Sequence, residues 1–126
     1  MPEAWQSRSE RPTPVVPLVH VRIEELLEGL KQEPTWRSSD RNAITLTKEP
    51  HLRVVLIAMK KGARLHEHRA SGPLTIQAAS GSLRLSASDQ ILELKPGEMA
   101  ILESAIEHEV EALEESALLL TLVKPT

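Results

Sequence analysis

The stretch that decides the fold is residues 74–102, which read LTIQAASGSLRLSASDQILELKPGEMAIL. Short apolar runs in it alternate with polar residues, and breaks rich in Gly, Pro, Ser and Asp separate the runs at 80–81, 88–89 and 95–97. A period of two is typical of strands with one buried face. The pattern continues on both sides, from residue 44 to residue 123. It predicts about eight short strands in an all-β sandwich or barrel.

The region before the strands divides into two segments. Residues 1–17 contain four of the nine prolines and are predicted to be an extended or disordered arm, because such a segment buries little. Residues 22–33 are predicted to form one amphipathic helix that Pro34 ends, because apolar side chains recur there at helical spacing: Ile23, Leu26, Leu27 and Leu30. Residues 18–126 are therefore expected to be a single domain.

The composition excludes several classes of protein. There are no cysteines among the 126 residues, which excludes disulfides and thiol nucleophiles. The charge balance of 15 basic and 18 acidic residues gives no basic field, and Trp5 and Trp36 are the only aromatic residues besides histidine. We therefore expect no nucleic-acid partner. No apolar run approaches the roughly 20 residues that span a bilayer, so no membrane association and a cytoplasmic location are expected.

Two closely spaced histidines carry the first sign of a site. His66 and His68 are two residues apart, so on a strand they share one face. Two imidazoles on an otherwise aliphatic surface would lack hydrogen-bond partners if buried, and a divalent metal would resolve this by taking one ring nitrogen from each, with a third ligand from a distant strand. The alternative is that both rings are wet and hydrogen-bonded at the mouth of a barrel. The spacing alone is a weak signal.

Two motifs resemble those of the cupin superfamily. The first reads Gly62-Ala63-Arg64-Leu65-His66-Glu67-His68 and ends at Gly81, and the second runs from Gly97 to His108 after Lys95-Pro96. The resemblance covers about residues 42–123. It implies a double-stranded β-helix, the cupin or jelly-roll barrel, which here carries one N-terminal amphipathic helix and an extended Pro-rich arm. The chain is thus similar to a small single-domain cupin of the conserved-barrel type.

The resemblance also implies a metal site, with one ligand missing. His66, His68 and His108 match the family's histidine ligands, whereas its glutamate position falls on Pro73 or Leu74. Three interpretations stay open. The three imidazoles still hold Fe²⁺, Mn²⁺, Ni²⁺ or Zn²⁺; or Gln77 substitutes through its amide oxygen, although its parity opposes this; or the metal is lost and the histidines act as hydrogen-bonding or acid–base groups.

Two functional hypotheses follow from these interpretations. The first is a cupin that binds a metal and a small organic ligand in the barrel, with dioxygenase-like or isomerase-like chemistry. The second is a non-catalytic module that binds or senses a small molecule and has lost the metal. Whether the protein is an enzyme stays open, and so does the substrate. Gln77 and Arg64 are further candidates for lining the ligand.

The outer faces of the predicted strands suggest two more expectations. Glu107, Glu109 and Glu111 have the parity opposite to His108, so they are expected on a solvated strand face rather than in a site.

The helix stripe, the arm and the apolar outer positions in residues 54–58 give more apolar surface than one barrel hides. A homodimer that packs sheet against sheet, or that exchanges the arm, is therefore expected.

Overall fold

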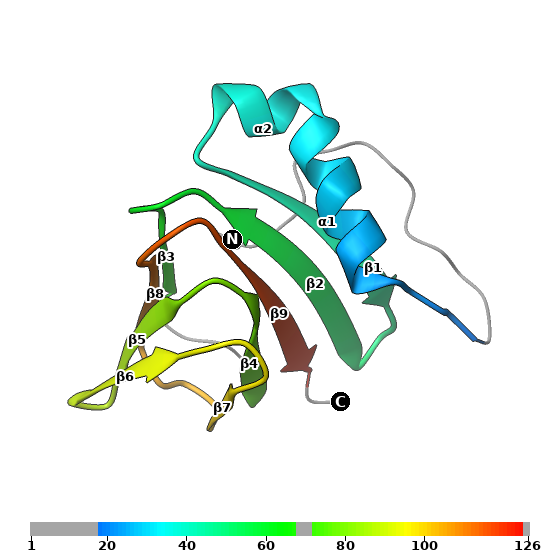
Figure 1. The fold of residues 1–126 in the computed structure, drawn as a ribbon. Coiled ribbons are helices and arrows are strands. Elements are labelled where there is room, and N and C mark those ends of the chain that lie inside the picture. Colours follow the sequence, from blue (N-terminus) through cyan, green and yellow to red (C-terminus); the bar gives the residue numbers. More distant parts are fainter. Residues whose placement is uncertain (1–17, 68–71, 125–126) are drawn as a thin grey trace.

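Two antiparallel sheets form the body of the molecule. The computed structural model describes residues 18–67 and 72–124. The large sheet has the strand order β1 (Arg41–Lys48), β2 (Leu52–Met59), β9 (Ser116–Val123), β4 (Leu74–Ser80) and β7 (Met99–Leu102). The small sheet has the order β3 (Arg64–Glu67), β8 (His108–Ala112), β5 (Leu83–Ala87) and β6 (Gln90–Leu94). The predicted all-β fold is confirmed, and Figure 1 shows the two sheets as the walls of an incomplete barrel.

The inner faces of the two sheets make the main core. Alternate residues along each strand point inward, and they are almost all Leu, Ile, Val or Ala. The register aligns Val55, Leu120 and Ile76 across the large sheet and Leu65, Val110 and Leu85 across the small one. All six are buried. The hydrophobic residues of this main core therefore include no aromatic side chain among those that the structure describes.

Two helices cover the outer face of the large sheet. α1 (Ile23–Gln32) lies over β1 and β2, and α2 (Pro34–Ser38) follows at once, with its proline in the first turn where no amide donor is needed (Figure 1). Leu30 and Trp36 pack there against outer-face residues of β2 such as Leu56. The chain's own helices thus cover the apolar positions 54–58. These positions are therefore no argument for a partner subunit, and the homodimer stays a prediction from the sequence.

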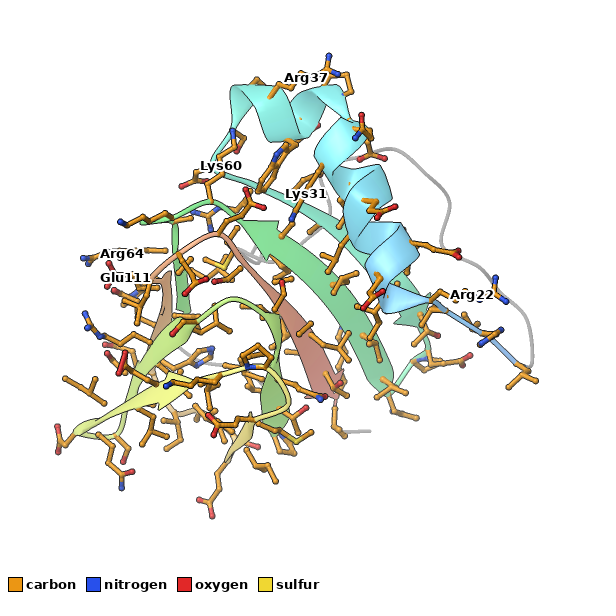
Figure 2. The ribbon with its side chains drawn as sticks, in the orientation of Figure 1. Arg22, Lys31, Arg37, Lys60, Arg64 and Glu111 are labelled. Carbon is orange, nitrogen blue, oxygen red and sulfur yellow. The ribbon has the colours of Figure 1, made fainter. Side chains whose placement is uncertain are left out.

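Polar contacts fasten the helical layer to the sheet. The buried Asn42 amide donates to the Leu30 carbonyl at 3.0 Å and to Glu33 Oε1 at 2.8 Å, and its oxygen accepts from the Ala43 N–H. Lys31 Nζ lies 2.7 Å from Glu115 Oε2, in the turn before β9. Figure 2 shows the Lys31 side chain between α1 and the sheet. These polar contacts hold α1 against the sheet in addition to its apolar packing.

One end of the barrel, which we call the closed end, is sealed by a shared hydroxyl. Ser116 Oγ accepts from the Ser82 N–H at 3.0 Å and lies within donating distance of the Ser82 and Glu114 carbonyls, at 3.1 and 2.7 Å. Gly81 sits against this hydroxyl with a φ of 76°, which favours glycine. We call the opposite end the cavity end. Two buried polar residues, Arg53 and His108, lie on the inner faces toward this end.

Candidate ligand-binding site

A cavity opens at the cavity end, where the two sheets separate. β6 and β7 are edge strands, and they do not pair with each other in the part of the chain that the structure describes. The gap holds a cavity of about 250 Å³, which is small compared with the roughly 300–1,000 Å³ of drug-sized sites. Its walls are mainly aliphatic and its rim is polar. The aliphatic residues are Leu85, Ala87, Leu92, Ala100, Ile101, Leu102 and Ile106, and the polar ones are Ser88, Gln90 and Glu103.

His108 is not one of the residues that line this cavity, but it adjoins two of them, Ala87 and Ile106. It is directly opposite Ala87 in the register of β5 and β8, and it is only 5% exposed. Its Nδ1 lies 3.1 Å from the carbonyl oxygen of Ile106. Because a carbonyl can only accept, Nδ1 is the donor in this contact, and the tautomer that donates from Nδ1 has its lone pair on Nε2. The fold therefore presents a buried, oriented acceptor next to an apolar cavity.

His66 lies on the other side of the small sheet. It is opposite Glu109 in the register, its side chain is 44% exposed, and its Nδ1 is 3.3 Å from Glu109 Oε2. Arg64 shares this outer face and pairs with Glu109 at 3.3 Å and with Glu111 at 3.7 Å. Figure 2 shows Arg64 and Glu111 side by side there. The structure therefore does not bring His66 together with His108, whereas Glu109 and Glu111 lie outward as predicted.

A residue that the sequence analysis missed faces the interior. Arg53 is opposite Leu122 in the register of β2 and β9, on the inner face, and it is only 6% exposed. Its neighbours Leu52 and Val54 have the opposite parity, so the arginine takes a position that aliphatic residues fill elsewhere on this wall. No alternation marks it in the sequence, because both faces of β2 are buried.

Known proteins match in structure rather than in sequence. No family model and no curated protein matches the sequence. A cupin superfamily protein from Desulfitobacterium hafniense superposes with a TM-score of 0.66 at 15% identity, over 94% of this chain and 95% of that one. A cupin 2 conserved barrel domain protein from Leptotrichia buccalis gives 0.67 at 26% identity, over 78% of this chain and 46% of that one. The chain therefore has the cupin fold.

A third similar structure is a domain of a regulator. It is the cupin 2 domain of an XRE family transcriptional regulator from Enterobacter cloacae, which this chain matches with a TM-score of 0.60 at 12% identity. The match covers 70% of this chain and 99% of that domain.

In the described ranges 18–67 and 72–124, no helix has the length and apolar character needed to cross a bilayer.

The cupin fold implies a metal, which the described residues do not fit. His66 and His108 face opposite sides of the small sheet, so one ion cannot contact both. The glutamate position of the family falls at Leu74, which is buried in the core. Within the ranges that the structure covers, no group of three His, Cys, Asp or Glu side chains could hold an ion. His68 lies outside the described residues.

The two other candidate lining residues also lie outside the cavity. Gln77 is opposite Leu119 and Met99 in the register, on the outer face of the large sheet, as its parity indicated. Arg64 is on the outer face of the small sheet, with its acidic partners. Gln77 and Arg64 were expected to line the ligand, but the register of the sheets places both on outer faces, away from this cavity. The buried polar residues on the inner faces toward the cavity end are instead His108 and Arg53.

Proposed function

We propose that this cupin is a binding module that takes one small organic molecule at the cavity end. The apolar part of the molecule occupies the cavity between β6 and β7, and a hydroxyl or amine of the molecule donates to Nε2 of His108. The observation that carries the proposal is the buried imidazole, which the Ile106 carbonyl orients beside an aliphatic cavity of about 250 Å³. Such a site, mostly apolar with few oriented polar groups, is what small-molecule sites have in common.

The similarity to a regulator's cupin domain supports binding rather than catalysis. That structure comes from a transcriptional regulator, and a sensing domain needs a pocket and an orienting group without a reaction centre. The dioxygenase-like and isomerase-like alternatives require a metal donor set that the described residues do not form. The metal, the homodimer and the cytoplasmic location stay predictions from the sequence.

The first test compares the two histidines. The probe is 1,2-hexanediol, which has a short apolar tail and donor hydroxyls, titrated into ¹⁵N-labelled protein. We expect amide shifts centred on Ala87, Ala100 and Ile106. His108→Gln should weaken binding about 5–10-fold, because one hydrogen bond in an apolar site contributes about 1–1.5 kcal/mol. His66→Gln is the matched control and should leave affinity within about twofold, since that side chain is on the outer face.

The same variants test the metal interpretation. We expect diol binding to survive removal of divalent ions with a chelator. One equivalent of metal in the purified protein that disappears in His66→Gln would contradict the binding-module proposal. Equal losses of diol affinity in the two histidine variants would also contradict it, because only His108 adjoins the cavity.

A further inference from the structure

We infer that the ligand of this cavity is a primary amine with a short apolar body, and that Glu103 binds its ammonium group at the rim together with Ser88 and Gln90. The inference rests on the proposed function, because it assigns the chemistry of the molecule that occupies the same cavity. Its starting point is the kind of polar side chain that lines the cavity, which is a carboxylate, a hydroxyl and a primary amide.

Short segments of both sheets bring these polar groups to the rim. Gln90 begins β6 and has the same parity as Leu92, which also lines the cavity, and Ser88 lies in the turn before β6. Glu103 follows Leu102, the last residue of β7, which belongs to the large sheet. A head group at the opening between β6 and β7 therefore meets polar groups from both edges.

The three side chains are available to a ligand. Each of Ser88, Gln90 and Glu103 is exposed, and none has a hydrogen bond or an ion pair with another residue in the ranges 18–67 and 72–124. The carboxylates of Glu109 and Glu111, in contrast, pair with Arg64 on the outer face of the small sheet. The carboxylate of Glu103 therefore has its acceptor positions open at the rim.

The charge around the cavity favours a cation. Among the described residues that line the cavity, there is no Lys, Arg or His, and Glu103 is the one residue with a formal charge. An adjoining hollow, which shares part of its lining with the cavity, adds Asp89 and Glu107 and again no base from the described chain. A carboxylate or phosphate of a ligand would face like charge there, whereas an ammonium is attracted.

The hydrogen-bonding character of the rim favours a primary ammonium among cations. Such a group has three N–H donors and no acceptor. The carboxylate of Glu103, the hydroxyl of Ser88 and the amide oxygen of Gln90 are all acceptors, so the rim holds a partner for each donor. A quaternary ammonium has no N–H and would leave these acceptors unused. The apolar body of the amine then occupies the aliphatic part of the cavity.

The exposure of the rim sets the size of the effect. An exposed carboxylate attracts a cation only weakly in water, and salt screens the attraction. We therefore expect the ammonium to improve binding about three- to fivefold over a neutral head group at low salt. At about 0.5 M salt the improvement should fall below about twofold.

The test uses three probes that share an apolar tail and a hydroxyl on the second carbon. They are 1-amino-2-hexanol, 1,2-hexanediol and 2-hydroxyhexanoate, which at neutral pH are a cation, a neutral molecule and an anion. In titrations of the full-length ¹⁵N-labelled protein, the amine should bind about three- to fivefold more tightly than the diol, and the acid more weakly than both. The amide shifts should include Ser88, Gln90 and Glu103. N-acetylation of the amine removes its charge and should remove the preference.

Two variants that each neutralise one carboxylate locate the contact. Glu103→Gln keeps the size of the side chain and should bring the ratio of amine to diol affinity to about one. Glu93→Gln is the matched control, because Glu93 is an exposed residue of the same edge strand β6, lies opposite Arg84 on the outer face, and does not line the cavity. It should keep most of the preference for the amine.

The outcomes separate this inference from the proposed function. If the diol binds at the cavity but the amine binds no better, the ammonium assignment is wrong and the proposed function stands. If neither probe binds, both are wrong. Tighter binding of the acid than of the amine overturns the sign of the charge, and equal losses in Glu93→Gln and Glu103→Gln overturn the contact with Glu103. Should Glu103→Gln fail to fold, as judged by circular dichroism, the N-acetyl comparison and the salt dependence in the wild type still decide the question.

Discussion

Gly81→Ala should lower the free energy of unfolding by about 3 kcal/mol or more. The residue has a φ of 76°, which costs a non-glycine residue on the order of 1 kcal/mol. An added Cβ would also overlap Ser116 Oγ and the Glu115 carbonyl, and it would lie 2.7 Å from the Ser116 Cα. Two of these three neighbours are backbone atoms, so the methyl group forces the strands apart at the closed end. Chemical denaturation followed by far-UV circular dichroism measures the loss.

Gly97→Ala is the matched control for this substitution. Its φ of 89° is as unfavourable for alanine, but nothing lies within 4 Å of the added Cβ. We expect a loss of about 1 kcal/mol, which is the backbone cost alone. Losses of equal size in the two variants would show that the closed end is not packed against Gly81 as described.

Leu30→Ala should lower the free energy of unfolding by about 2–5 kcal/mol. Leu30 is 2% exposed and belongs to the cluster that joins the helices to the outer face of the large sheet. Truncation leaves a cavity under α1, and it weakens the layer that covers Leu56 and Ala58. Because Trp36 belongs to the same cluster, its fluorescence should change in step with unfolding. Thermal and urea denaturation give the magnitude.

Leu18→Ala provides the comparison for the helical layer. Leu18 is 84% exposed, so its truncation should change stability by no more than about 0.5 kcal/mol. If Leu30→Ala were as mild as Leu18→Ala, the helices would contribute little to the fold. The outer face of β2 would then need another cover, and the expectation of a partner subunit there would return.

The fold was predictable because its signals are local. Strand alternation and the glycine, proline and serine breaks in residues 74–102 depend on neighbouring residues, and so does the helical stripe of Ile23–Gln32. What covers the helix stripe depends on tertiary packing. The sequence indicated apolar outer positions at 54–58 but could not show that α1 covers them. Sequence alone therefore left a partner subunit as the natural cover.

The candidate site was harder to predict from the sequence than the fold. Alternation shows which residues of a strand share a face, but it does not show which face points into the barrel. His66 follows Arg64 at a distance of two, whereas Ala63 and Leu65 have the other parity. The aliphatic pair is the one that turns inward. The apolar character of Ala63 and Leu65 therefore indicated the correct inner face. The prediction that His66 points inward followed the resemblance to the histidine motif instead. For Arg53 no such signal exists, since its neighbours on β2 are apolar on both faces.

The sealed end also sets how solvent reaches the backbone. The Gly62 N–H donates to the Ala112 carbonyl at 2.8 Å and the Leu113 N–H to the Ser82 carbonyl at 2.9 Å, and Ala63, Leu83, Ala112 and Ser116 are buried there. β6 and β7 each have one unpaired side in the described chain. Deuterium should therefore replace amide protons from the β6 and β7 edges inward. The amides beside Ser116 should exchange only when the whole molecule unfolds, so their rate reports the global stability of the chain.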